Sequence, residues 1–238
     1  MTLLEASKPK LKTERYLSVR GPTKIPRDLF SVIYGHKEVK EILKRSLKSE
    51  MPVHVLLVGD TSSAKSLFMS ELSRLKGSAF ILGGLSTKAG IRDIIQSGAR
   101  YIIIDELDKI ESGKDLSALL SFMESGVIAV AKHKKHTIVR GKAWVFAACN
   151  RTDRLPPELL SRFLVLRIPK YTKEELKLVI VKVLRSRERK GKGLAEYIAE
   201  KTVNDLKSRD PRDAVKIARL ARTKREVDKI VEILKKYQ

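Results

Sequence analysis

The chain has 238 residues, with 50 Lys and Arg against 28 Asp and Glu and a formal net charge of +22. This length can bury one sizeable core and still carry a small second domain. The excess of positive charge favours polyanionic partners such as nucleic acids. The charged surface of a heat-adapted protein would explain the 33% of charged residues but not the imbalance between the two signs.

The composition also excludes several classes of protein. Cys149 is the only cysteine, so no intramolecular disulfide can form, and we expect a cytoplasmic chain with this residue in a core strand. No run of residues approaches the ~18 apolar residues of a membrane span. The N-terminal run MTLLEASKPKLKTER carries acidic residues and lacks the uninterrupted apolar region of a signal peptide. We therefore expect no membrane attachment.

The order of predicted elements along the chain indicates an α/β fold. Residues 1–27 are polar and basic, and Pro22 and Pro26 interrupt any regular element, so we expect a basic N-terminal arm. Beyond a first helix, β-prone runs alternate with helical patterns, which predicts a parallel sheet with helices on both faces. The expected strands are Val53–Val58, Ala79–Leu82, Tyr101–Ile104, Ala143–Ala148 and Phe163–Ile168, and the expected helices are His36–Leu47, Lys65–Leu75, Lys88–Gln96 and Asp115–Met123.

The run VLLVGDTSSAKS, from Val55 to Ser66, predicts a phosphate-binding loop after a buried strand. It matches the pattern G-x-x-x-x-G-K-[ST] with alanine in place of the second glycine. Backbone N–H groups of such a loop point at phosphates, and the next helix presents its positive N-terminus to them. Lys65 would reach the β- and γ-phosphates of ATP, and the Ser66 hydroxyl would bind Mg²⁺. The predicted nucleotide-binding residues are Gly59, Asp60, Thr61, Ser62, Ser63, Ala64, Lys65 and Ser66.

A second motif, YIIIDELDK, places two carboxylates at the end of another buried strand, 40 residues after Lys65. Asp105 would bind Mg²⁺ or one of its waters, and Glu106 would polarise the water that attacks the γ-phosphate. An isolated Asp-Glu pair at a strand end is often only a solvated surface. Together with the phosphate-binding loop, the pair predicts binding and hydrolysis of a nucleoside triphosphate.

After Pro169 the pattern changes to helical segments without strands, which predicts a small C-terminal helical domain over residues 170–238. The predicted helix starts are two capping boxes and one Asp-Pro pair, and two glycines separate the first two helices. These residues are Thr172 with Glu175, Thr223 with Glu226, Asp210 with Pro211, and Gly191 with Gly193.

These motifs fall in the order found in AAA+ ATPases, and the resemblance covers roughly residues 28–222. WVFAACN is similar to the sensor 1 strand of that family, which implies that Asn150 contacts the attacking water or the γ-phosphate.

LPPELLSRF closely resembles the arginine-finger segment of MCM replicative helicases. The match implies that Arg162 reaches the γ-phosphate held by a neighbouring subunit, where a guanidinium suits developing phosphate charge. Arg151 and Arg154 are weaker candidates, and a surface ion pair is the simpler alternative for Arg162.

Two further segments resemble nucleotide-contacting parts of the family. SRDPRDAVKIARLA is similar to the sensor 2 segment, with Arg212 as the best match and Arg209 as an alternative. FSVIYGHKEVKEIL resembles the segment that contacts adenine, which implies that Ile33 and Tyr34 flank the base and Gly35 permits close approach. Core packing alone would predict the same apolar residues.

The segment between the carboxylate strand and Asn150 predicts a basic hairpin at about residues 126–142. Two β-prone runs, Val127–Ala131 and Thr137–Val139, flank KHKKH, and no acidic residue occurs from Gly126 to Asn150. MCM helicases carry a similar hairpin with a basic tip that lines the central channel, and RuvB motors carry one nearby. A basic tip suits the phosphate backbone of any sequence. The predicted DNA contacts are Lys132, Lys134 and Lys135; an ordinary solvated turn is the alternative.

The resulting hypothesis is a parallel-sheet P-loop (AAA+) domain over residues 28–169 with a small helical lid domain. We expect a Mg²⁺-dependent ATPase that forms a homo-oligomeric ring, most simply a hexamer. This ring would act on DNA as a helicase or branch-migration-like motor. The large N-terminal DNA-binding domain of MCM proteins and the winged helix of RuvB are not recognisable in the sequence. A MoxR-like protein-remodelling ATPase and a slow ATP-dependent loader or switch are the alternatives.

Overall fold

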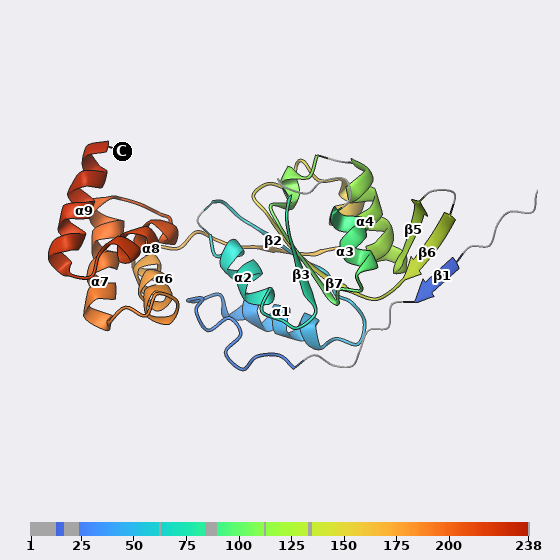
Figure 1. Cartoon of the computed structure of the whole chain (residues 1–238), viewed down its shortest axis with the longest axis horizontal. Coiled ribbons are helices and arrows are strands. Elements are labelled where there is room, and N and C mark those ends of the chain that lie inside the picture. The colour runs from blue at the N-terminus through green and yellow to red at the C-terminus, as the bar shows by residue number, and fades with distance from the viewer. Residues whose placement is uncertain are drawn as a thin grey trace, which may run out of the picture.

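The computed structural model describes residues 13–16, 24–61, 63–83, 90–111, 113–132 and 135–237. It consists of an α/β part that ends with strand β8 (Leu164–Arg167) and a set of helices that begins at Lys173. An extended segment joins the two parts, and the helices pack beside one end of the α/β part (Figure 1). Within the described residues, no helix is long and apolar enough to cross a membrane.

The central sheet of the described chain has five strands in the order β3-β4-β7-β2-β8. All neighbouring strands are parallel, which confirms the predicted fold class. The carboxyl ends of the strands therefore meet along one edge of the sheet, the usual location of a ligand site in this class of fold. Besides β8, the strands are β2 (Val55–Val58), β3 (Ser78–Leu82), β4 (Tyr101–Asp105) and β7 (Trp144–Cys149).

Alternating residues of these strands enter two separate cores, one on each face of the sheet. In β2, Val55 and Leu57 join the first core, whereas Leu56 and Val58 join the second. Because both faces are buried, the strands read as continuous apolar runs. Cys149 is buried at the end of β7, as the sequence predicted.

Helices cover both faces of the sheet and mostly match the predicted spans (Figure 1). Helix α2 ends at Leu72 rather than Leu75, because the chain turns towards Gly77, which has a positive φ of 80°. The predicted start of α3 at Lys88 lies outside the described residues. The helices of this part are α1 (Lys37–Lys48), α2 (Lys65–Leu72), α3 (Gly90–Gln96), α4 (Gly113–Ser125) and α5 (Pro157–Leu160).

A second, smaller sheet follows α4. Strands β5 (Val127–Lys132) and β6 (Lys135–Arg140) are antiparallel, and β1 (Thr13–Tyr16) pairs in parallel with β6. At the base of the hairpin, the N–H of Gly141 donates to Gly126 O, and a Cβ on Gly126 would lie 2.7 Å from Gly141 O. The sequence did not predict β1, because its short run becomes a strand only by pairing with a segment far along the chain.

The C-terminal helices begin where the sequence placed their caps. The Thr172 side chain accepts from the N–H of Glu175, whose carboxylate accepts from Thr172 in return. Asp210 caps the helix that starts at Pro211 by accepting from the N–H of Arg212 at 2.8 Å. Gly193 lies inside a helix rather than between two. The elements are α6 (Lys173–Ser186), α7 (Lys192–Glu200), a π-helical turn (Lys201–Asp205), α8 (Pro211–Leu220) and α9 (Lys224–Tyr237).

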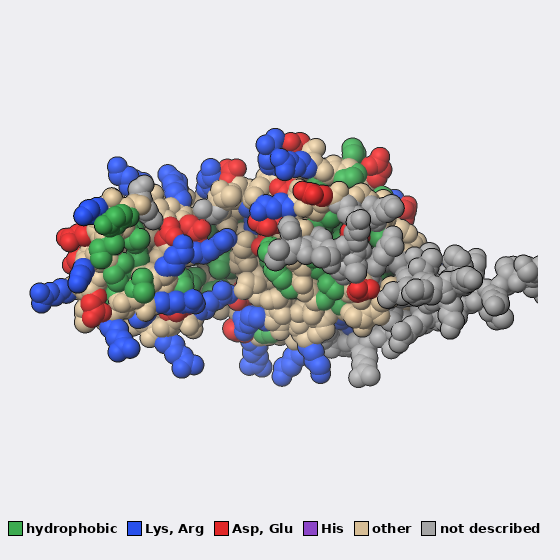
Figure 2. Space-filling model, turned by 45° about the horizontal axis from the view of Figure 1, so that its top comes forward, with side chains coloured by type: hydrophobic (Ala, Val, Ile, Leu, Met, Phe, Trp, Pro, Cys, Tyr) green, Lys and Arg blue, Asp and Glu red, His purple; other side chains and the backbone are tan. Residues whose placement is uncertain are grey.

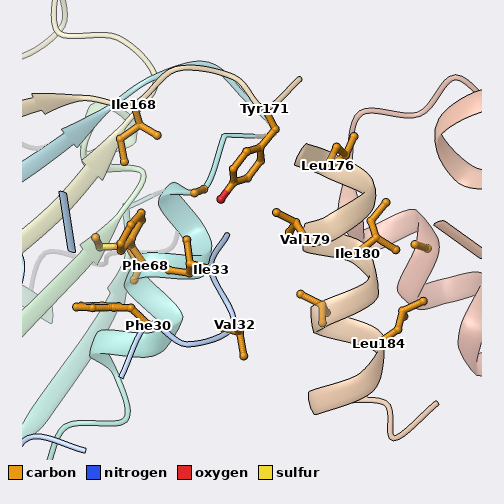
Figure 3. Packing of buried hydrophobic residues seen from close by; sticks show 14 of the residues in the cluster. Phe30, Val32, Ile33, Phe68, Ile168, Tyr171, Leu176, Val179, Ile180 and Leu184 are labelled. Carbon is orange, nitrogen blue, oxygen red and sulfur yellow. The ribbon is translucent and has the colours of Figure 1, made fainter. Parts of the chain in front are cut away.

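The two parts of the chain share one hydrophobic core. Phe30, Ile33 and Phe68 belong to the same buried cluster as the inner face of α6. Figure 3 shows Tyr171 between these two groups of side chains. The helical domain is therefore packed against the first face of the sheet domain through α6 and the segment before α1.

Candidate functional site

The predicted nucleotide motifs converge on one cavity at the carboxyl edge of the sheet, next to the helical domain. The cavity has a volume of about 380 Å³. The phosphate-binding loop follows β2, the two carboxylates follow β4, Asn150 follows β7, and Arg212 comes from α8. The lining residues are Thr61, Ser63, Lys65, Ser66, Leu67, Ser70, Asp105, Glu106, Cys149, Asn150, Tyr171, Arg187, Asp210, Pro211 and Arg212.

The backbone of the phosphate-binding loop explains its unusual sequence. Ala64 has φ −66° and ψ 0°, in the right-handed region, so a Cβ is tolerated where the pattern usually has glycine. Gly59 is different, because a Cβ there would lie 2.5 Å from the carbonyl oxygen of Ile168. The loop is thus tightly bounded by the segment after β8. Ser62 lies outside the described residues.

The Lys65 side chain is buried, and its ammonium group lies within the curve of this loop. It donates to the carbonyl oxygens of Gly59 and Asp60, both at 2.7 Å, and to the Ser63 hydroxyl at 3.0 Å. Burial lowers the pKa of Lys65, and the negative charge of Asp105 opposes that shift. These hydrogen-bond acceptors are all neutral, and a bound phosphate group would supply an anionic partner for the buried cation.

The carboxylate pair after β4 occupies a constrained turn. Glu106 has a φ of 58°, in the left-handed region, which is strained for a side chain of this type. A Cβ on Gly83 would lie 2.0 Å from the Glu106 carbonyl oxygen, so only glycine permits this close approach. The Glu106 carboxylate forms a 2.7 Å ion pair with Lys109, one turn further along. Glu106 lines the cavity, and the ion pair with Lys109 restrains its carboxylate.

Asp108 is a site residue that the sequence did not single out. Its carboxylate accepts from the backbone N–H groups of Asn150 and Arg151, both at 3.2 Å. These hydrogen bonds tie the turn after β4 to the turn after β7 and fix where Asn150 enters the cavity. Cys149, which precedes it, also lines the cavity, and burial raises its pKa to about 12.

Two side chains that follow β8 in the sequence complete the cavity without having been predicted. Arg187, at the end of α6, donates to the buried carboxylate of Glu71 at 3.2 Å and to the Ser70 hydroxyl at 3.4 Å. Glu71 also accepts from the N–H of Phe30 at 3.1 Å and pairs with Arg74 at 2.7 Å. Arg187 therefore links α6 to the helix that follows the phosphate-binding loop. The other side chain is Tyr171, just before α6.

The predicted adenine-contacting residues lie beside the cavity rather than in its lining. The Ile33 side chain is fully buried in the core, and the Tyr34 carbonyl accepts from the Tyr171 hydroxyl at 3.1 Å. The Tyr171 ring lies 5.0 Å from the ring of His36. Tyr171 follows a strand in an ordinary linker, so only the three-dimensional structure shows that it lines this cavity. Gly35 has a positive φ of 63°.

Arg162 lies outside the cavity formed by its own chain. Its guanidinium forms a 2.5 Å ion pair with Glu124, at the end of α4. Arg151 pairs with Asp153 at 2.7 Å.

Asp60 pairs with Lys170 at 2.9 Å rather than lining the cavity. Lys132 ends β5 and Lys135 begins β6, and their side chains, together with the whole of Lys134, lie outside what the structure describes.

The donor set at the phosphate end of the cavity fits Mg²⁺. Ser66 and Asp105 both line the cavity, and one Asp105 oxygen accepts from the Glu106 N–H at 3.0 Å. Mg²⁺ commonly takes one or two protein oxygens and completes its octahedron with phosphates and waters. Among the described residues, no group of three or more His, Cys, Asp and Glu could hold a metal by itself. This site therefore suits a metal that arrives with a polyphosphate.

Comparison with known families agrees with this geometry. The model of the MCM P-loop domain matches residues 20–176, which is more than half of the chain. The chain belongs to the MCM P-loop family. It is 30% identical over 173 residues to the minichromosome maintenance protein MCM of Saccharolobus solfataricus, a match over 55% of this chain and 25% of that protein. It is 31% identical over 186 residues to the DNA replication licensing factor MCM7 of Arabidopsis thaliana, over 59% of this chain and 25% of that protein.

The matches cover about a quarter of the length of these MCM relatives. Among solved structures, the chain is similar to the Thermotoga maritima RuvB Holliday junction branch migration motor, with a TM-score of 0.60 and 24% identity. This match covers 88% of the chain and 72% of RuvB. A RuvB mutant from the same organism gives a TM-score of 0.63. These structures establish that the MCM P-loop chain has the AAA+ fold with C-terminal helices.

Proposed function

We propose that this chain is an ATP-hydrolysing AAA+ module that works on DNA as part of a homo-oligomeric ring. The observation that carries the proposal is the convergence of Lys65, Ser66, Asp105, Glu106 and Asn150 on one cavity of about 380 Å³. These residue types supply a phosphate-binding cation, a metal site, a base and a water-positioning amide. The MCM and RuvB relatives, whose names refer to DNA replication and branch migration, support DNA as the partner.

Each part of the cavity has a separate task in this proposal. The loop N–H groups and Lys65 would hold the phosphates, while Ser66 and Asp105 would hold Mg²⁺. The bound metal would neutralise charge that develops on the phosphate oxygens. Glu106 would accept a proton from the attacking water once its ion pair with Lys109 opens, and Asn150 would orient that water. Arg212, which lies in the first turn of α8, would report the nucleotide to the helical domain.

Arg162 is proposed to act on the nucleotide of a neighbouring subunit. It does not line the cavity of its own chain, and its side chain is 41% exposed. A guanidinium delivered from outside stabilises the charge of the transferring phosphoryl group. Hydrolysis would then require assembly, which fits a ring in which the site lies between subunits. We propose a hexamer by resemblance to the family.

The hairpin is proposed to be the DNA-contacting element. Its strands β5 and β6 follow α4 directly and lie at the end of the α/β part away from the C-terminal helices (Figure 1), whereas those helices contribute Arg187 and Arg212 to the cavity. Lys132, Lys134 and Lys135 lie at its tip by sequence position. A cationic tip contacts phosphates without reading base sequence. Motion of the helical domain during hydrolysis would be coupled through the ring to motion of the tips along DNA.

The chemistry is tested by the variant Glu106→Gln. The amide keeps the shape of the side chain but cannot accept a proton, so ATP binding should persist while turnover falls by roughly 10²–10⁴-fold. Binding is measured with a fluorescent ATP analogue and turnover by phosphate release. Glu111→Gln is the matched control, because Glu111 is an exposed glutamate that does not line the cavity. Turnover by Glu106→Gln at the wild-type rate would remove Glu106 from the role of base.

A further inference from the structure

A row of lysines follows one face of α1. Lys37, Lys40, Lys44 and Lys48 are spaced by three, four and four residues, which places them on one side of a helix. At 1.5 Å per residue the row is about 16 Å long. These lysines, together with Glu41 and Arg45, line a shallow groove of about 510 Å³. Glu41 is already paired with Arg45 at 2.6 Å, so the acid in this groove does not balance the lysines.

A second basic groove lies on the helical domain, where α6 ends and α7 begins. It has a volume of about 550 Å³, and its charged lining consists of cations only: Lys182, Arg185, Arg189, Lys190 and Lys192. The nearby Glu188 is paired with Arg219 at 2.8 Å, and the carboxylate of Glu196 lies 3.8 Å from the Lys192 ammonium. Figure 2 shows Lys and Arg side chains projecting from the edges of both domains.

The two grooves meet where the domains pack together. The Lys40 ammonium donates to the Ile33 carbonyl at 2.6 Å, and the Lys182 ammonium lies 5.7 Å from the centre of the Tyr34 ring. The two cations therefore flank the same pair of residues. Burial lowers the pKa of Lys40, and the positive charges of Lys182 and Lys44 lower it further. The two grooves therefore adjoin at Lys40 and Lys182, and their basic lining residues together are called here the α1–α6 surface.

The α1–α6 surface has little internal compensation. Within the part of the chain that the structure describes, no ion pair involves Lys37, Lys44, Lys48, Lys182 or Arg185. Like charges held close together repel each other, so the free protein is destabilised by this arrangement and an anionic partner would relieve it. A surface that served only solubility would gain from interspersed acids.

We propose that the α1–α6 surface is a second nucleic-acid-binding site, which contacts the phosphate backbone separately from the hairpin. Each strand of duplex DNA carries one charge per about 3.4 Å, so the row on α1 alone can face several phosphates. A membrane surface fits less well, because interfacial helices pair their cations with exposed Trp, Phe or Leu. The lining of both grooves contains no such residue.

The same stretch of α6 also contacts the nucleotide cavity. Arg185 lines the basic groove, whereas Arg187, two residues later, lines the cavity and pairs with Glu71. Nucleic acid bound across both domains would therefore favour one position of α6 relative to α2. This site rests on the proposed function only in that its partner is also a nucleic acid. Its residues are different from those of the hairpin.

The test compares two variants of the full chain that each remove three exposed positive charges. The first is Lys44→Gln/Lys48→Gln/Arg185→Gln, on the α1–α6 surface. The control is Lys76→Gln/Arg225→Gln/Lys229→Gln, whose residues are exposed and lie in neither groove. Binding of labelled single-stranded and duplex DNA is measured by fluorescence anisotropy over a range of salt. The hairpin variant Lys132→Ala/Lys134→Ala/Lys135→Ala is measured in parallel.

We expect the surface variant to bind DNA at least several-fold more weakly than the control variant. Its plot of log affinity against log salt should flatten by about 0.9 for each duplex phosphate that it no longer neutralises, whereas the control keeps the wild-type slope. Equal affinity and slope for the surface and control variants would overturn the inference. Weaker binding by the hairpin variant alone would also overturn it while supporting the proposed function. Wild-type binding to polyglutamate but not to DNA would overturn both.

Discussion

The carboxyl edge of the central sheet and the hairpin after α4 have their geometry fixed in different ways. At the sheet edge, each functional side chain follows a strand that is buried on both faces, so the core determines its position. Asp105 ends β4 and Asn150 directly follows β7. The hairpin projects from the same domain, and its strands join only the small second sheet with β1. We infer that catalysis requires side chains that the core holds in position. Binding to a repeating polyanion depends on positive charge more than on exact position.

Arg162 is a proposed catalytic group that the core does not place in the cavity of its own chain. Arg162→Ala should bind ATP normally and lose roughly 10³-fold or more in turnover, because no guanidinium then reaches the neighbour's phosphate. Steady-state phosphate release measures the change in rate. Arg154→Ala, at the exposed arginine that is a weaker candidate for this role, should keep a turnover near the wild-type value, and a loss there instead would move the role to Arg154.

Mixing experiments separate a shared site from a local defect. Lys65→Ala should bind ATP poorly, since it lacks the cation of the phosphate-binding loop. Mixed with Arg162→Ala, it should restore part of the activity, because each variant supplies the residue that the other lacks. If confirmed mixed oligomers never exceed the activities of the separate variants, the site does not span two subunits.

The hairpin variant tests whether the tip of the hairpin binds DNA. Replacing Lys132, Lys134 and Lys135 with alanine should leave basal ATPase activity near the wild-type value but weaken DNA binding and stimulation by DNA. The salt dependence of duplex binding should become shallower by about 0.9 for each phosphate that the tip no longer neutralises, and the decrease in affinity should be similar for all base sequences. Unchanged affinity and slope would place DNA binding elsewhere.

The smallest expected effect concerns Arg187, where the helical domain contacts α2. Arg187→Gln removes the ion pair with buried Glu71, which keeps Arg74 and the Phe30 N–H as partners. We expect ATP affinity to fall by up to about tenfold, which is about 1.4 kcal/mol, with a smaller change in turnover, because Arg187 is a partly exposed cation whose charge is screened by solvent. Isothermal titration with a non-hydrolysable ATP analogue measures the affinity. Arg185→Gln, which is exposed and outside the cavity, should bind the analogue like the wild type.

The sequence predicted those elements whose causes are local. The apolar runs of β2, β4 and β7 indicated the parallel sheet, and the phosphate-binding pattern located Lys65 in a single contiguous segment. Thr172 and Asp210 could be recognised as caps because the bonded partners lie within three residues. In each case the interaction that forms the element is visible in neighbouring residues.

The features that the sequence missed depend on interactions between distant segments. Tyr171 and Arg187 line the cavity only because α6 packs against the segment before α1. Asp108 acts on Asn150 across two neighbouring strands. Gly83 had no visible pattern, although the close approach of Glu106 requires it. Strand β1 forms only by pairing with β6.

In this account the core holds the residues of the nucleotide site in position, and ATP hydrolysis at that site is coupled to DNA binding. The most direct test of this coupling is the ATPase rate of the full chain with and without single-stranded, duplex and branched DNA at matched salt. Glu106→Gln serves as the background control. We predict that DNA raises the wild-type rate severalfold and that the hairpin variant loses most of this stimulation. A wild-type rate that no DNA changes, in assembled protein that hydrolyses ATP, would contradict the account.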